Sequence, residues 1–301
     1  MNKKLFLFTI FLFLFHLSVY ATDIDLKNKI ISVPSISGYG MQGFTTVDDK
    51  IFAVFINGDD SKSIIKVWNI NTGKEIYGKI YSSLGHANDV TYNSLNEKIM
   101  VVHGGGSSLV HVFNLEYEYL YDVDFSLPIR SLTYVPSVNS YVARMVSTGY
   151  YFNDDFSLKS KVPFLANMIF SSDVARQGWS YYNHYIYYAT WSWIRYGGDG
   201  SNIIHVYDMS GNEVDYYHTS DDIGELEDVS FYQDKMILGF NSYNDTIDFY
   251  MEDVPEIVLD EEETEDIEES VKEPFPYGYI IIAYGIILLT VAILLYRKKR
   301  L

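Results

Sequence analysis

Asn88-Asp89-Val90-Thr91-Tyr92 is one copy of a five-residue segment that occurs five times along the chain. Each copy has two polar or small residues, an apolar residue and then Thr or Ser, and four copies end in an aromatic residue. The other copies are Gln42-Gly43-Phe44-Thr45-Thr46, Arg130-Ser131-Leu132-Thr133-Tyr134, Gln177-Gly178-Trp179-Ser180-Tyr181 and Glu227-Asp228-Val229-Ser230-Phe231. The apolar members are 46, 42, 47 and 50 residues apart. A period of this size with strand-like contents is typical of architectures that repeat one small β-sheet.

Each repeat contains further strand-like segments after this first one. The second segment lies at 51–56, 98–103, 141–146, 185–190 and 235–240. The third lies at 64–69, 109–114, 149–153, 203–208 and 246–251. Their nearly continuous apolar and β-branched residues indicate strands that are covered on both faces. We therefore predict an all-β, five-bladed β-propeller with one four-stranded sheet per repeat.

The fourth, outermost strand of this pattern is recognisable in only four repeats. These four segments are 74–80, 117–125, 157–164 and 213–218. In the fifth repeat an acidic run begins where the strand is expected, whereas the segment 26–33 before the first repeat is strand-like. We expect 26–33 to pair with 246–251, because this pairing closes the ring and removes exposed sheet edges.

On these motifs, and on glycine-containing turns such as Ser210-Gly211-Asn212, the segment 22–253 resembles the β-propeller repeat superfamily. The superfamily is meant here in the broad sense that includes WD40-like, YVTN-type and quinoprotein-type repeats. The chain has no Trp-Asp dipeptide, which WD40 repeats carry. The resemblance implies a rigid binding platform, although some five-bladed members are glycosidases, and the fold alone does not decide between these functions.

The first 21 residues have the features of a secretory signal peptide. Lys3 and Lys4 precede an apolar run at 5–17, and Val19-Tyr20-Ala21 has small residues at the positions that a signal peptidase reads. An uncleaved N-terminal anchor is the alternative, but the apolar run is short for a full membrane span.

The C-terminal region predicts a membrane anchor on a stalk. Residues 277–296 carry no charge and are followed by Arg297-Lys298-Lys299-Arg300, so we predict a transmembrane helix at 276–296 and a cytoplasmic tail at 297–301. Residues 252–273 hold twelve acidic residues and one lysine, which predicts a disordered acidic stalk over 254–275. The expected localisation is therefore the cell membrane, with one span and the propeller outside.

Charge and cysteine content restrict the partners of the propeller. Residues 22–251 carry a net charge of −13, and a domain this acidic is a poor nucleic-acid binder. The chain has no cysteine, so the domain must be stabilised by its core without disulfides. We expect an extracellular glycan, peptide or protein as partner, the membrane through one helix, and no nucleic acid and no cofactor.

Two groups of residues are candidates for the ligand site. The residues just before each innermost strand are expected to form a polar ring at one mouth of the central channel, or simply to be solvated there. This ring comprises Gln42, Asn88, Arg130, Gln177 and Glu227, with Asp89 and Asp228 beside it. The loop 191–200 of the fourth blade adds Trp191, Trp193, Arg195 and Tyr196, residue types that anchor interfaces, unless the tryptophans fold down and plug the channel.

Catalytic and metal sites are not expected. A glycosidase needs two carboxylates that flank one bond, but Asp89, Glu227 and Asp228 come from blades two and five, which are not adjacent in a ring of five. The histidines show no zinc-type spacing, and His111 and His205 occupy equivalent third-strand positions, which indicates repeat structure. A binding module is the leading hypothesis, and a glycoside hydrolase or a structural component of a surface layer or adhesion array are the alternatives.

Overall fold

The computed structural model describes residues 22–257 except 146–147, 163–173, 193–197 and 221. All described strands belong to one compact unit that ends at Ile257. The predicted signal peptide, most of the acidic stalk, the predicted transmembrane helix and the basic tail lie outside the described residues. Within the described part of the chain, no helix has the length and apolar character needed to cross a membrane.

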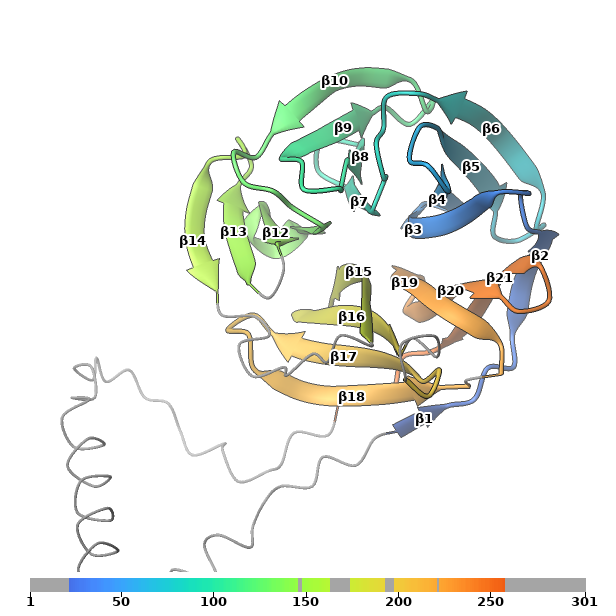
Figure 1. Cartoon of the computed structure of the whole chain (residues 1–301). Coiled ribbons are helices and arrows are strands. Elements are labelled where there is room, and N and C mark those ends of the chain that lie inside the picture. The colour runs from blue at the N-terminus through green and yellow to red at the C-terminus, as the bar shows by residue number, and fades with distance from the viewer. Residues whose placement is uncertain (1–21, 146–147, 163–173, 193–197, 221, 258–301) are drawn as a thin grey trace, which may run out of the picture. The chain divides into compact units, whose positions relative to one another are not determined.

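The strands form five sheets arranged in a ring, which confirms the predicted five-bladed propeller (Figure 1). Blade 1 consists of β3 (Tyr39–Val47), β4 (Lys50–Asn57), β5 (Ser63–Asn69) and β6 (Glu75–Tyr81). Blade 2 consists of β7 (Asp89–Asn93), β8 (Lys98–Val102), β9 (Leu109–Phe113) and β10 (Tyr119–Asp124). Blade 3 consists of β11 (Ser131–Val135), β12 (Ser140–Arg144), β13 (Gly149–Asn153) and β14 (Leu158–Val162), with the 3-10 helix η1 (Pro136–Val138) between β11 and β12.

The last two blades include strands from the N-terminal segment. Blade 4 consists of β15 (Val174–Tyr182), β16 (Tyr185–Ser192), β17 (Asn202–Asp208) and β18 (Glu213–Thr219), extended by β1 (Thr22–Ile24). Blade 5 consists of β19 (Gly224–Tyr232), β20 (Lys235–Ser242), β21 (Thr246–Asp253) and β2 (Lys29–Pro34). In every blade the first repeat segment forms the innermost strand.

The N-terminal strand closes the ring as the sequence predicts. β2 pairs antiparallel with β21, with Ile31 opposite Phe249 and Val33 opposite Ile247. The buried carboxylate of Asp248 accepts hydrogen bonds from Ser32 Oγ at 2.6 Å and from Lys29 Nζ at 2.9 Å. Apolar packing and a partly buried ion pair therefore join the two ends of the ring.

A second N-terminal contact is not evident in the sequence. β1 pairs in parallel with β18, with Asp23 opposite His218, and Ile24 is buried in the same apolar cluster as Tyr217. The segment before the first repeat thus supplies edge strands to two neighbouring blades.

The Thr/Ser position of the repeat joins adjacent innermost strands. Thr91 Oγ1 accepts the backbone N–H of Tyr134 at 3.1 Å, and Thr133 Oγ1 accepts that of Tyr181 at 2.9 Å. Ser230 Oγ accepts the N–H of Thr46 at 3.1 Å, between blades 5 and 1. Innermost strands have no backbone ladder on the channel side, so these hydroxyls satisfy N–H groups that would otherwise be buried without a partner.

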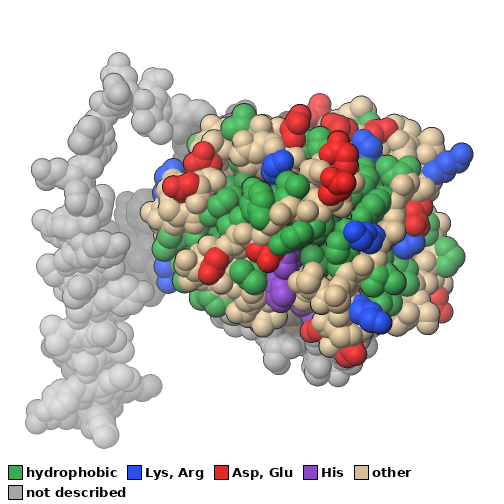
Figure 2. Space-filling model, turned by 90° about the horizontal axis from the view of Figure 1, so that it is seen from above, with side chains coloured by type: hydrophobic (Ala, Val, Ile, Leu, Met, Phe, Trp, Pro, Cys, Tyr) green, Lys and Arg blue, Asp and Glu red, His purple; other side chains and the backbone are tan. Residues whose placement is uncertain are grey.

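The outer rim exposes apolar side chains on two neighbouring blades. The exposed large residues there are Ile76, Ile80, Tyr119, Leu120 and Tyr121, on β6 and β10. Figure 2 looks onto this side of the molecule, where hydrophobic side chains alternate with acidic and basic ones. Exposed apolar groups on edge strands are candidates for protein contacts.

Candidate functional site: the channel and its mouth over blade 1

Asp89 and Asp228 meet in the channel although blades 2 and 5 are not adjacent. Both carboxyl groups are fully buried, and they lie close enough for each to shift the pKa of the other. Asp89 Oδ2 also accepts the N–H of Leu132 at 2.9 Å, and Asp228 Oδ2 accepts that of Phe44 at 2.9 Å. Each aspartate therefore links its own blade to the next one, in the same manner as the Thr/Ser hydroxyls.

Two glycines make room for this pair. Gly43 and Gly178 hold the repeat position that Asp89 and Asp228 hold in their blades. A Cβ atom on Gly178 would lie 2.2 Å from Asp228 Cγ, and one on Gly43 would lie 2.9 Å from Asp89 Cα. With Gly in blades 1 and 4, Ser in blade 3 and Asp in blades 2 and 5, this position leaves room for two carboxyl groups that larger side chains would overfill.

Burial and mutual repulsion disfavour two negative charges in the channel. Burial raises the pKa of Asp89 to about 7. Burial is the main reason why the pKa of Asp228 lies well above its usual range, and the charge of Asp89 raises this pKa further. The pair therefore holds a proton under neutral conditions, and the O–H of Asp228 can donate to the Asp89 carboxylate. A glycosidase requires two carboxyl groups that flank a space for the substrate. Asp89 and Asp228 instead face each other without such a space between them.

A cavity opens over blade 1, at the mouth where the innermost strands begin. It has a volume of about 860 Å³ and receives residues from blades 1, 2 and 5. The polar side chains that line it are Ser35, Ser37, Gln42, Asn57, Asp60, His86, Asn241 and Asp245. Gln42 is the member of the predicted polar ring that reaches this cavity, and no Lys or Arg is among the described residues that line it.

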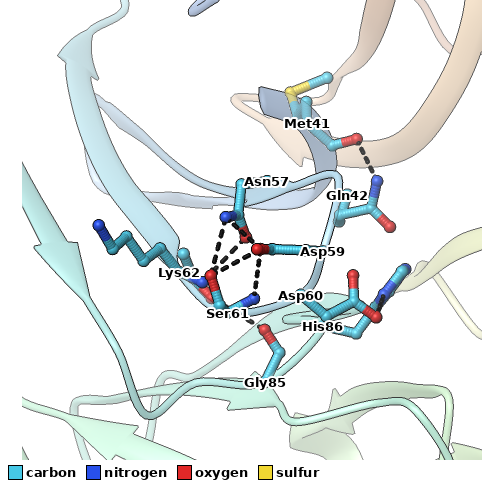
Figure 3. A network of polar contacts seen from close by, with 10 residues as sticks. Met41, Gln42, Asn57, Asp59, Asp60, Ser61, Lys62, Gly85 and His86 are labelled. Carbon is cyan, nitrogen blue, oxygen red and sulfur yellow. Dashed lines mark hydrogen bonds and ion pairs between the residues drawn. The ribbon is translucent and has the colours of Figure 1, made fainter. Parts of the chain in front are cut away.

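A hydrogen-bonded turn fixes one wall of the cavity (Figure 3). Asn57 Oδ1 accepts the N–H of Lys62 at 2.9 Å, and Asp59 Oδ1 accepts that of Ser61 at 3.1 Å. These side-chain-to-backbone bonds are the usual means by which Asn and Asp stabilise turns. The turn places Asp60 Oδ2 3.0 Å from His86 Nδ1, so a carboxylate and an imidazole from two blades stand side by side.

Asn241 fixes the opposite wall. Its Oδ1 accepts the N–H of Met41 at 3.0 Å and its Nδ2 donates to the carbonyl of Met41 at 3.1 Å, which joins blade 5 to blade 1. Asn241 Nδ2 also donates to the buried side chain of Glu227. Burial is the main cause that raises the pKa of Glu227, and the charge of Glu225 raises it further. Gln42 Nε2 donates to the same Met41 carbonyl at 3.0 Å (Figure 3).

The residues of the predicted polar ring do not all meet at one place in the structure. Gln42, Gln177 and Glu227 each lie at a β-bulge of their innermost strand, which re-aims a side chain. Gln177 Nε2 donates to Glu225 at 2.7 Å, so it joins blades 4 and 5. Asn88 packs against Gly104, and Arg130 is exposed.

Of the predicted blade-4 residues, Trp191 is the one that the structure describes, and it is not among the residues that line the cavity over blade 1. Trp191 is half-buried on β16, opposite Ala175 on one side and Asn202 on the other. Trp193, Arg195 and Tyr196 lie outside the described residues.

Sequence reasoning missed the residues that line the cavity over blade 1. The loop 57–62 has an ordinary turn composition, and His86 lies alone in its segment, so neither stands out in the sequence. It also missed Arg144. The signal that could have revealed this residue is its position as a charged residue at the end of an apolar strand.

The equivalent histidines belong to repeated hydrogen-bond rows. His111 Nδ1 lies 2.6 Å from Asp122 Oδ1, and His205 Nδ1 lies 2.6 Å from Glu213 Oε1. Each row thus joins the third strand of a blade to its outer strand, as expected for repeat structure. Among the described residues, no group of three or more His, Asp or Glu could hold a metal ion.

A second cavity, of about 330 Å³, lies at the opposite mouth of the channel. It is lined by the Thr/Ser hydroxyls and aromatic residues of the repeat, and by Asp234. Tyr182 Oη donates to Asp234 Oδ1 there at 2.9 Å. This smaller mouth offers an internal control for experiments on the larger one.

The solved structures that match this fold have low sequence identity to the chain. A tail fibre of Staphylococcus aureus phage P68 matches with a TM-score of 0.52 and 10% identity, over 76% of this chain and 52% of that chain. The RRP9 WD40 repeats match with a TM-score of 0.38 and 11% identity, over 71% and 62% of the two chains. U3-55K matches with a TM-score of 0.39 and 12% identity, over 69% and 63%.

These likenesses concern the fold alone. The chain spans less than two thirds of the length of each of these three structures. No protein-family model and no curated protein matches the sequence. The function must therefore be argued from the site.

Proposed function

We propose that this protein is a membrane-anchored, cell-surface binding module whose propeller holds its ligand at the channel mouth over blade 1. The observation that carries the proposal is the cavity of about 860 Å³ with polar walls from three blades. Its volume lies within the range of roughly 300–1,000 Å³ that is usual for small-ligand sites. The walls are fixed by the Asn57–Lys62 turn and by Asn241, so the site is largely pre-formed.

The chemistry of the lining favours a ligand with hydroxyl or amide groups. Amide side chains, serines and the Asp60–His86 pair offer donors and acceptors. The described residues that line the cavity include acidic side chains but no Lys or Arg, which disfavours an anionic group there. A neutral glycan, or a peptide segment bound through its backbone, meets these requirements.

The surface location rests on the sequence of the two ends. A secretory signal at 1–21, an acidic stalk at 254–275 and an uncharged span at 276–296 before a basic tail would place the propeller outside the cell. The propeller ring begins and ends within residues 22–257, next to this stalk.

A calorimetric and thermal-shift screen of residues 22–257 against neutral glycans and peptides tests the proposal. This fragment contains every strand of the closed ring. A ligand at 100 times its Kd should stabilise the fold by about 2.7 kcal/mol. Asp60→Asn should remove most of this shift, because it removes the charge that faces His86.

Asp234→Asn at the opposite mouth is the matched control. Asp60 and Asp234 are both turn residues with positive φ, at 58° and 60°, a conformation that Asn tolerates well. Equal losses of binding in the two variants, or binding that neither changes, would contradict a site over blade 1.

A structural role in a surface layer or adhesion array is the second candidate. The exposed apolar residues on β6 and β10 favour it, because they are the kind of surface that a protein contact covers. Sedimentation of residues 22–257 tests it: Ile80→Ser should abolish any self-association, whereas Leu158→Ser on the outer strand of blade 3 should not.

A further inference from the structure

Three of the four arginines in residues 22–257 come together where blades 3 and 4 meet. The N–H of Arg130 donates to the carbonyl of Arg144 at 2.7 Å. Arg144 Nη2 in turn donates to the carbonyls of Arg176 at 3.4 Å and Gln177 at 3.2 Å. We call Arg130, Arg144 and Arg176 the arginine cluster. Arg130 and Gln42 hold the same repeat position, so the cluster lies at the same mouth of the channel as the larger cavity.

Arg144 is the buried member of the cluster, with 1% of its surface exposed. Its Nη2 donates to Ser131 Oγ at 2.7 Å, and its guanidinium carbon lies 5.1 Å from the centre of the Tyr188 ring. Nε and Nη1 of Arg144 have no hydrogen-bond acceptor. Since Nε carries one N–H and Nη1 carries two, three of the five guanidinium donors are unused.

Two of these arginines have no carboxylate partner among the described residues. Neither Arg130 nor Arg144 forms an ion pair with a described carboxylate within 4.0 Å. Burial lowers the pKa of Arg144, and the charges of Arg130 and Arg176 lower it further. Asp89 is the acidic group that acts on Arg144, but its two oxygens accept the N–H groups of Val90 and Leu132.

Such an arrangement is costly to fold unless something else compensates it. A buried charge with unused donors destabilises a protein by several kcal/mol. The domain has a net charge of −13 over residues 22–251, so carboxylates are abundant elsewhere on it. Like charges that gather at one place are a feature of binding sites for the opposite charge.

We propose that the arginine cluster binds a carboxylate group of an acidic ligand, at a site separate from the cavity over blade 1. The planar guanidinium fork matches a carboxylate in a bidentate manner, and Arg does so better than Lys. A single negative charge suits the site better than a dianion, because the Asp89 charge lies within range of Arg144. The exposed Arg130 makes the first contact, and Arg144 supplies the unused N–H donors.

The carboxylate can come from an acidic sugar or from a peptide, and calorimetry on the full-length protein in detergent distinguishes the two. The probes are trigalacturonate and its methyl ester for the sugar source. For the peptide source they are N-acetyl-trialanine with a free C-terminus and the same peptide as its amide. We expect one acid probe to bind while its neutral counterpart does not, and the binding to weaken with added salt.

Three variants locate the site. Arg130→Gln changes an exposed side chain and should weaken acid binding by about tenfold or more. Arg144→Lys keeps the charge but loses the fork, and should also weaken it. Lys74→Gln removes an exposed cation from the turn between β5 and β6, and should leave the affinity unchanged.

Several results would overturn the proposal. These are no binding of either acid probe, equal binding of acid and neutral probes, or an Arg130→Gln affinity equal to that of Lys74→Gln. Since Arg130 is exposed, its variant gives a clear answer even if Arg144→Lys fails to fold. Competition between the acid probe and a ligand of the blade-1 cavity would contradict two separate sites.

Discussion

At the scale of single residues, the second position of the repeat decides what fills the channel. It is Gly in blades 1 and 4, Asp in blades 2 and 5, and Ser in blade 3. The aspartates reach across the space that the glycines leave, and each also caps a backbone N–H of the next blade. The position therefore serves ring closure, and the carboxyl pair at its centre has two testable consequences.

Stability should fall as the pH rises from about 4 towards 7 and above. A carboxyl group whose pKa is higher in the folded chain holds more protons when folded, so its contribution is complete below the unfolded pKa of 3.8. It is lost as the pH rises through the folded value, which is about 7 for Asp89 and also raised for Asp228. Thermal unfolding of residues 22–257 between pH 4.5 and 8 measures this.

Asp228→Asn should lower stability at pH 5 but flatten this pH dependence. An amide cannot titrate. Asp228 accepts the N–H of Phe44 on one oxygen and that of Val229 on the other, and the amide nitrogen of Asn cannot accept the one that it faces. We expect a loss of about 1–3 kcal/mol for that unmet bond. A pH profile as steep as that of the wild type would contradict the assignment to the pair.

Gly178→Ala should destabilise the propeller by about 1–3 kcal/mol or more, because the new methyl group overlaps the Asp228 carboxyl group. Gly58→Ala is the control, since a Cβ there has open space within 4 Å. Urea unfolding of both variants gives the comparison, and equal midpoints would show that the channel has room to spare.

At the scale of elements, the N-terminal segment holds the ring closed from outside. β2 covers β21, and β1 extends blade 4 through β18. Without β2, the buried residues Ile247 and Phe249 lose their neighbours across the strand, and the Asp248 carboxylate loses both of its side-chain partners. β2 is thus the strand farthest in sequence from the other three strands of its sheet, and it is the one that completes the sheet.

Removing residues 22–34 should therefore cost several kcal/mol and expose a sheet edge that promotes aggregation. Removing only residues 22–25 should cost about 1 kcal/mol, because β1 buries a single large side chain, Ile24. Chemical unfolding and light scattering of the two truncations, beside residues 22–257, test the difference. Similar stability of both truncations would contradict closure by β2.

At the scale of the whole molecule, the proposed arrangement separates binding from anchoring. The described ring is complete without residues 258–301, and those residues contain the predicted span. Full-length protein should thus sediment with membranes and resist extraction by salt, whereas residues 22–257 should stay in the supernatant. Release of the full-length chain by high salt alone would contradict an integral anchor.

The sequence by itself determined the number of blades, their strands and the closing strand, because backbone pairing and burial leave a local pattern that each repeat shows again. It placed 26–33 against 246–251 correctly, although more than 200 residues separate them. Here the missing fourth strand of the last repeat and the spare strand before the first repeat were both visible in the sequence.

Only the tertiary structure decided which side chains meet. Asp89 and Asp228 lie in non-adjacent blades, and their contact depends on the volume that Gly43 and Gly178 leave free. The cavity over blade 1 likewise combines residues of blade 1 with residues of blade 5, and the arginine cluster combines residues of blades 3 and 4. Closure of the ring creates these contacts, and the spacing of residues along the chain carries no trace of them.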